Sequence, residues 1–99
     1  MAWATHLIKD LLEGRTVQCR PRGNSMTGRV GSGQLCTIEP LSRPPQKGDV
    51  VLCKVRGTQY LHLVSAVRPD QFQISNNHGH VNGWTRAKNV FGLLVRVEA

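Results

Sequence analysis

A serine in a glycine-rich stretch is the first residue whose surroundings could support chemistry. Ser25 lies in residues 22–35, which read RGNSMTGRVGSGQL. A strand that ends at Gly23 and turns back into the sheet can expose the hydroxyl beside free backbone N–H groups, which an oxyanion needs. The hydroxyl attacks a carbonyl only when a nearby base accepts its proton. We predict Ser25 as a nucleophile in an oxyanion-binding loop with Gly23, Asn24 and Met26; a plain turn is the alternative.

His62 is the candidate base. It lies in the strand-like run 59–67, and the turn at 69–70 predicts a hairpin with the next run. In that register His62 would face Asn77 or a near neighbour, so Asn76 or Asn77 could orient its ring, as in Cys-His-Asn hydrolases. Neutral imidazole, with an unperturbed pKa of about 6.5, can accept a serine proton near pH 7. A half-buried strand histidine bonded to backbone is the alternative.

One short helix and about six strands are expected to position these residues. Apolar residues recur at helical spacing within residues 1–14, and Gly14 is a natural stop. Extended runs bounded by turn residues follow at 16–20, 34–38, 49–55, 59–67, 71–75 and 90–97. The sequence predicts a single domain over 1–99, with the helix in 1–14 and a β core over 15–97. We expect a mainly β fold with a small curled, barrel-like sheet.

The composition indicates a basic protein outside the membrane. No segment has the roughly 18 apolar residues of a membrane span, and the N-terminus lacks the pattern of an export signal. We therefore expect a soluble, cytoplasmic protein without membrane contact. The net charge is +7 and the sequence pI about 10.2, which favours nucleic acid or another acidic partner; a solvated basic surface explains it equally.

Cysteine and histidine usage predicts neither a disulfide framework nor a cofactor. The chain has three cysteines, and an odd number without an export signal argues against paired bridges. No close cysteine pair exists, and His78 with His80 does not make a zinc site alone. Those two histidines could substitute for the base or bind a metal, but an exposed loop is the simpler account. We expect no metal and no cofactor.

Five segments, taken in order, resemble the catalytic core of the LexA and signal-peptidase superfamily of serine proteases. In its nucleophile box, Ser-Met is followed by proline, an aliphatic residue and Gly-Asp before a strand. Ser25-Met26, Val30 and Gly33 match this box, while Gly28 replaces the proline and Gln34 the aspartate. Residues 47–51, 59–64, 74–77 and 89–95 resemble the later boxes, although Ser75 and Asn76 replace the first two residues of a Gly-Asp-Asn box.

The resemblance implies a Ser-His form of the protease core. Most members carry lysine as the base, whereas the endoplasmic-reticulum type of signal peptidase carries histidine, which aligns with His62. No acid occupies the position of the aspartate in those enzymes. Asp70 falls at the predicted hairpin tip and Asp49 at the start of a neighbouring strand. The imidazole would then be oriented by an asparagine.

The resemblance also implies the substrate and leaves two alternatives. In this family the peptide lies as an extended strand along the sheet edge. The short segment before Ser25 and the lack of a helix-turn-helix predict cleavage in trans rather than self-cleavage. A catalytically inactive binding protein on the same scaffold, such as a phage- or plasmid-type regulator or inhibitor, is the first alternative. A β-barrel nucleic-acid binder is the second, with arginine and lysine residues tracking phosphates.

Overall fold

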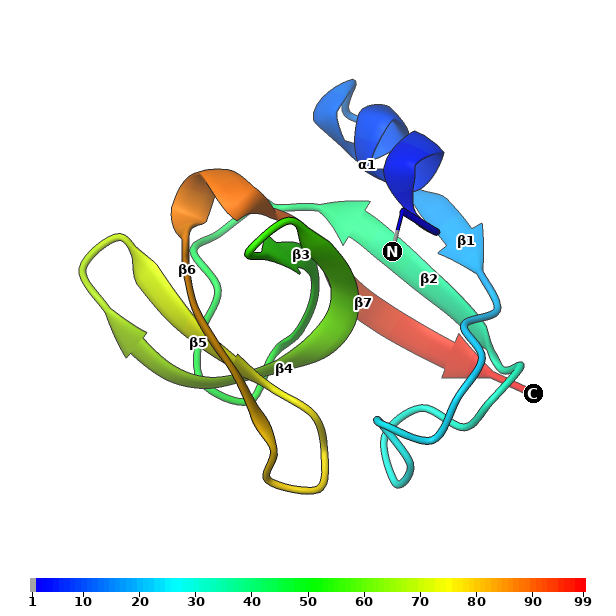
Figure 1. Cartoon of the computed structure of the whole chain (residues 1–99). Helices are drawn as coiled ribbons and strands as arrows, with labels where there is room; N and C mark the ends of the chain where they lie inside the picture. Colours follow the sequence, from blue (N-terminus) through cyan, green and yellow to red (C-terminus); the bar gives the residue numbers. More distant parts are fainter. Residues whose placement is uncertain (1) are drawn as a thin grey trace.

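The computed structural model describes residues 2–99 and contains one α-helix and seven strands (Figure 1). The elements in order are α1 (Thr5–Leu12), β1 (Val17–Cys19), β2 (Leu35–Pro40), β3 (Val50–Val55), β4 (Thr58–Arg68), β5 (Gln71–Ser75), β6 (Val81–Arg86), the 3-10 helix η1 (Ala87–Asn89) and β7 (Val90–Glu98). The predicted mainly β class with one N-terminal helix is confirmed.

The sheet is curled but not closed. Its strands follow the order β1-β2-β7-β3-β4-β5-β6, and each neighbouring pair is antiparallel. β1 and β6 stand at opposite ends of this order and on opposite sides of the molecule (Figure 1). The barrel-like expectation is therefore corrected to an open curled sheet. β1 is only three residues long and pairs with β2 alone, so one of its edges remains open.

Two apolar clusters on opposite faces of the sheet form the core. β3 is the central strand, and its side chains alternate between the clusters, Leu52 on one side and Val51 and Cys53 on the other. α1 covers the first cluster with the buried residues of its inner face, as its helical periodicity predicts: Leu7, Ile8 and Leu11. Because β3 is buried on both faces, the strand paired with it has a firm support.

The β3–β4 hairpin provides that pairing. Arg56 and Gly57 form its two-residue turn with φ values of 50° and 80°, the left-handed conformation that tight hairpins require. The register places His62 opposite Val51, which is fully buried. His62 is therefore held in β4, which pairs with β3, the central strand of the sheet.

β6 is a strand that the sequence did not predict. Asn82 and Gly83 interrupt its apolar pattern, although Trp84 and Thr85 are strong strand formers. Gly83 has a φ of 140° and lies so close to Val55 that an added Cβ would be 3.3 Å from its Cγ1 atom. The interruption thus allows β6 to approach the β3–β4 turn. β6 also carries Asn82, whose side chain contacts His62.

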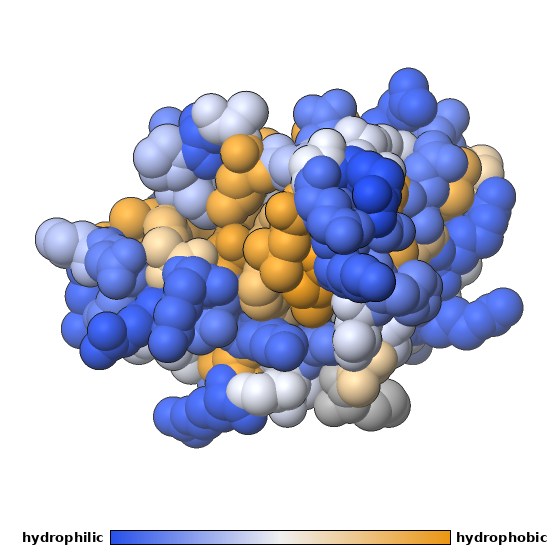
Figure 2. All heavy atoms as spheres, turned by 90° about the horizontal axis from the view of Figure 1, so that it is seen from above, coloured by the Kyte–Doolittle hydropathy of each residue, from blue (hydrophilic) through white to orange (hydrophobic). Residues whose placement is uncertain are grey.

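The surface divides into apolar and polar regions. Seen from above, hydrophobic residues gather in the middle of one face and hydrophilic residues flank them (Figure 2). Within residues 2–99, the helices are too short and too polar for any of them to span a bilayer.

Candidate active site

The structure brings Ser25 and His62 together from distant parts of the chain. Ser25 lies in the loop between β1 and β2, and His62 lies in the middle of β4. The Oγ atom of Ser25 is 3.2 Å from Nε2 of His62, within hydrogen-bond distance. His62 is only 7% exposed, whereas the serine is open to solvent. A shielded base beside an accessible hydroxyl is the geometry that general-base activation of a serine requires.

Asn82 on β6 orients the imidazole, a role that the sequence assigned to Asn76 or Asn77. Nδ1 of His62 is 2.7 Å from Oδ1 of Asn82. A carbonyl oxygen only accepts hydrogen bonds, so Nδ1 carries the ring proton and Nε2 offers its lone pair to Ser25. The assignment to Asn76 and Asn77 is wrong because β4 and β5 stop pairing at Leu63 and Ser75, before those residues. The Trp84-Thr85 pair was the available signal for the strand that carries Asn82.

Burial keeps His62 neutral. Loss of solvent lowers the pKa of its imidazole below the usual 6.5; the hydrogen bond that its Nδ1–H donates to Asn82 opposes this, and the charge of His80 adds to it. The ring of Tyr60 covers the imidazole with a centroid separation of 4.7 Å. Within residues 2–99, no carboxylate forms an ion pair with His62. The imidazole of His62 is therefore in its neutral, proton-accepting form at neutral pH.

Asn77 contacts the loop between β1 and β2 that carries Ser25, which we call the nucleophile loop, and not His62. Its backbone N–H donates to the carbonyl oxygen of Ser25 at 2.8 Å, and its Nδ2 donates to that of Thr27 at 2.8 Å. Nε of Arg29 donates back to Oδ1 of Asn77 at 3.0 Å. Gly28 makes this approach feasible, because its φ is 99° and an added Cβ would lie 3.0 Å from Nδ2 of Asn77.

The β5–β6 loop supplies a second contact of the same kind. Nε2 of His78 lies 2.8 Å from the carbonyl oxygen of Asn24. Asn76 shapes this loop, since its Oδ1 accepts from the backbone N–H groups of His78 and His80 at 2.8 and 2.9 Å. We call the contacts of Asn77 and His78 with the nucleophile loop the loop clamp.

The clamp leaves backbone donors near the serine. The loop is anchored in the core by Met26 and Val30, each 4% exposed, and Gly23 donates its N–H to Oγ of Ser32. Within the part of the chain that the structure describes, no oxygen accepts from the N–H groups of Ser25 or Met26. Two amide donors without an acceptor beside a hydroxyl can stabilise an oxyanion, and this role of the loop stays a prediction.

A cleft of about 770 Å³ opens beside the pair. β1 and the first half of β4, residues 58–62, provide two of its walls. This half of β4 pairs with β3 only, because β5 joins at Leu63. In a two-residue hairpin the hydrogen-bonded pairs alternate from the turn, so the N–H and C=O groups of Leu61 point away from β3. Within residues 2–99, no strand pairs with Leu61 on this side, and Leu61 lines the cleft with 5% of its surface exposed.

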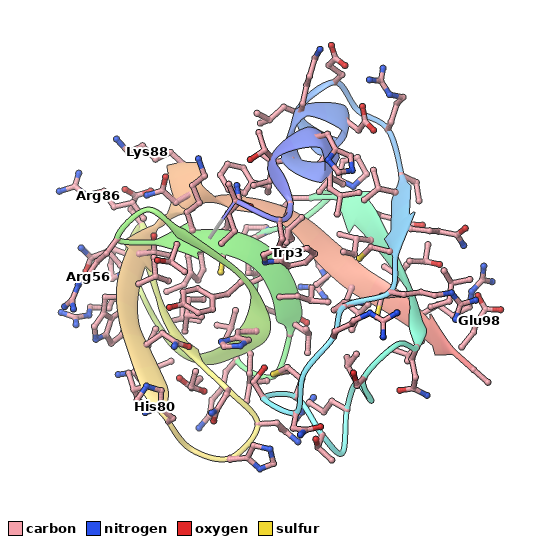
Figure 3. The ribbon with its side chains drawn as sticks, turned by 45° about the vertical axis from the view of Figure 1, so that its right-hand side comes forward. Trp3, Arg56, His80, Arg86, Lys88 and Glu98 are labelled. Atoms are coloured by element: carbon pink, nitrogen blue, oxygen red, sulfur yellow. The ribbon has the colours of Figure 1, made fainter. Side chains whose placement is uncertain are left out.

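The N-terminal segment closes one end of this edge. Nε1 of Trp3 donates to the outward carbonyl oxygen of Gln59 at 3.2 Å. Trp3 lies between α1 and β4 (Figure 3). The buried amide of Gln59 accepts from the N–H of Ala4 at 2.6 Å and donates to Oγ1 of Thr5 at 3.1 Å. The start of α1 is therefore fixed to the strand of the candidate base.

Outside the cleft, the histidines of the β5–β6 loop form no metal-binding cluster. The residues that the structure describes contain no group of three or more histidine, cysteine, aspartate or glutamate side chains that could hold an ion.

Comparison with protein-family models found no match for the chain, and a search of curated proteins found none either.

Proposed function

We propose that this protein is a serine peptidase that cleaves an extended peptide in trans, with Ser25 as nucleophile and His62 as general base. One observation carries the proposal. Asn82, His62 and Ser25 form a hydrogen-bonded line of 2.7 and 3.2 Å that ends at an exposed hydroxyl on the cleft. Orienter, base and nucleophile in this order are the parts of a hydrolytic triad.

The reaction proceeds in two balanced halves. Oγ of Ser25 bonds to the peptide carbonyl carbon while its proton moves to Nε2 of His62. The N–H groups of Ser25 and Met26 donate to the resulting oxyanion. The carbon–nitrogen bond then breaks, and His62 returns its proton to the leaving amine. Water repeats the sequence on the acyl-enzyme, giving its proton to His62 and releasing the acid, and Ser25 regains its hydrogen.

Asn82 is a positioning residue in this scheme. Its Oδ1 holds the productive tautomer and ring orientation of His62. An amide has no net charge, however, so it stabilises the imidazolium that forms in the transition state less than a carboxylate does. We therefore expect a slower enzyme than one with an aspartate at this position.

We also propose that the open curled sheet is the LexA and signal-peptidase core. The positions of the resembling segments support this proposal: the nucleophile box lies between β1 and β2, the second box at the start of β3, and the candidate base on β4. The last two boxes lie at the end of β5 and along β7. Gly28 departs from the family proline, and its φ of 99° is one that proline cannot adopt.

The substrate would add a strand beside Leu61. Its main chain can pair with the free N–H and C=O groups there, which would bring a carbonyl next to Ser25. This mode of binding is β-augmentation, in which backbone hydrogen bonds give affinity and side-chain pockets give specificity.

A serine-directed probe tests the nucleophile directly. The wild-type protein is incubated with a fluorophosphonate and digested, and the modified peptide is identified by mass spectrometry. Label on Ser25 that is lost in Ser25→Ala and His62→Ala, but kept in the exposed-serine control Ser42→Ala, supports the proposal. Equal labelling of the wild type and Ser25→Ala contradicts it.

An inactive binding protein on the same scaffold is the second candidate. The neutral Asn82 in place of an acid favours it, because hydrolases usually place a carboxylate behind the histidine. This candidate predicts that wild-type Ser25 stays unlabelled, although the protein captures an extended peptide with equal affinity before and after the Ser25→Ala change. Absence of label on wild-type Ser25, together with capture of the peptide by the wild type and by Ser25→Ala, would therefore select it over the peptidase.

A further inference from the structure

The charged side chains that line the cleft all have one sign. Arg20, Arg22 and His6 line it, and among the described residues 2–99 no aspartate or glutamate does. A cleft lined by one sign of charge raises the local concentration of ligands of the opposite sign. Its apolar wall includes Leu7 and Leu61, so the cleft combines an apolar surface with a basic rim.

Within the described part of the chain, no aspartate or glutamate forms an ion pair with Arg20 or Arg22. Within residues 2–99, the carboxylates that form ion pairs do so with arginines elsewhere: Asp10 and Glu13 with Arg15, Asp49 with Arg43, and Glu98 with Arg96. Arg20 uses one nitrogen to hold the loop, donating from Nη1 to the carbonyl oxygen of Gly33 at 3.0 Å.

Arg22 is the cation best placed to meet a ligand. Its side chain makes no hydrogen bond or ion pair with other parts of residues 2–99, and it is exposed. It precedes Ser25 by three positions, and an extended chain spans at most about 3.6 Å per residue, so their Cα atoms are at most about 11 Å apart. A substrate side chain within about three residues of the cleaved bond covers the same span.

We propose that the cleft selects peptides carrying an aspartate or glutamate within about three residues of the cleaved bond, with Arg22 as the principal specificity determinant and Arg20 as its support. This inference rests on the proposed peptidase function. A guanidinium suits the task because its planar donors match both oxygens of a carboxylate. Selection at a solvent-exposed pair is expected to be moderate, about fivefold for one charge.

A library of C-terminally amidated dodecapeptides tests the selectivity, since amidation removes the chain-end carboxylate as a rival anion. Cleavage sites are read by mass spectrometry. The wild type is expected to enrich aspartate and glutamate near the cut bond. Arg22→Ala should lower kcat/KM for acidic peptides about fivefold relative to neutral ones, and Arg22→Glu should shift the preference toward lysine-containing peptides.

The control separates local recognition from net charge. Arg86 and Lys88 lie with Arg56 at one end of the molecule, away from Trp3, and neither lines the cleft (Figure 3). The double change Arg86→Ala and Lys88→Ala removes two positive charges, the same change in net charge as Arg22→Glu. It should leave the acidic-to-neutral ratio unchanged. An equal loss of selectivity in this control and in Arg22→Glu would overturn the inference.

Binding to Ser25→Ala separates this inference from the peptidase proposal. The same library is enriched on the immobilised variant and compared with Ser25→Ala/Arg22→Glu. Enrichment of acidic peptides by the first protein alone supports acidic selection even if the wild type never cleaves. Enrichment without acidic preference contradicts the selectivity and leaves the peptidase proposal standing. If neither protein enriches any peptide, the proposed acidic selectivity is contradicted too.

Discussion

The two halves of the candidate dyad are built in different ways. His62 belongs to a strand whose neighbour in the sheet, β3, is buried on both faces, and its own side chain is nearly enclosed. Ser25 lies in an exposed loop without strand pairing, held by two core anchors and by the loop clamp of Asn77 and His78. The base is positioned by the core and the nucleophile by polar contacts between loops.

This difference separates stability from activity. Changes in the loop clamp remove hydrogen bonds that are partly exposed, so they cost little folding free energy. Those bonds nevertheless set the position of the hydroxyl, and a displacement of about 1 Å can reduce a rate about 100-fold. Changes near β3 disturb close packing, which costs folding free energy before it affects chemistry. The following variants test this division.

Removal of the base should have the largest effect on rate. His62→Ala leaves Ser25 without a proton acceptor, so kcat/KM is expected to fall about 10²–10⁴-fold. Peptide hydrolysis and fluorophosphonate labelling measure the loss. His80→Ala is the matched control, because this exposed histidine contributes only charge to the site, and its activity should stay close to wild type. Equal losses in both variants would rule out His62 as the specific base.

Variants of Asn82 should give the next largest effect. Asn82→Ala frees the ring of His62, so kcat should fall while the KM for the peptide changes little. Asn82→Asp should raise the pKa of His62 through the added negative charge. A pH–rate profile checks both.

The direction of the pH shift is fixed by the sign of each pKa change. In the wild type, burial lowers the pKa of His62, so the midpoint of the acid decline in activity should lie below the ordinary imidazole pKa of 6.5. In Asn82→Asp this decline should begin at a higher pH. Identical acid limbs in the two proteins would mean that Asn82 does not contact the working base.

Weakening the loop clamp should reduce the rate by a smaller factor. Asn77→Ala removes the side-chain bonds to Thr27 and Arg29, and we expect a fall in kcat of about tenfold, with Tm nearly unchanged. Asn89→Ala is the control, because this asparagine lies in η1, away from the nucleophile loop (Figure 1). A large drop in Tm with no change in kcat would show that the clamp supports folding rather than the nucleophile.

Gly92→Ala should have the smallest effect on rate and a clear effect on stability. An added Cβ would lie 2.7 Å from Cγ2 of Ile38 and 2.8 Å from Cδ1 of Leu11, so α1 must move away from β7. Overpacking of this kind costs about 1–3 kcal/mol of folding free energy. Denaturant unfolding measures it, and activity per folded molecule should persist. A loss of activity without a loss of stability would contradict the proposed division.

Much of the fold could be read from local patterns. Helical spacing predicted α1, and turn residues bounded six of the strands to within a few positions. The glycine-rich surroundings of Ser25 and the strand position of His62 also follow from neighbouring residues. These features depend on short stretches of chain, where propensity and periodicity act directly.

Only the tertiary structure decided which asparagine faces the base and what holds the nucleophile. The ladder is irregular between Val64 and Ala66 and again between Ile74 and Ser75, and such irregularities change which residues face each other. Contacts between distant segments depend on the summed register of all the strands between them, which no local pattern encodes. Asn82 therefore contacts His62 from β6, whereas Asn76 and Asn77 contact residues of the loops.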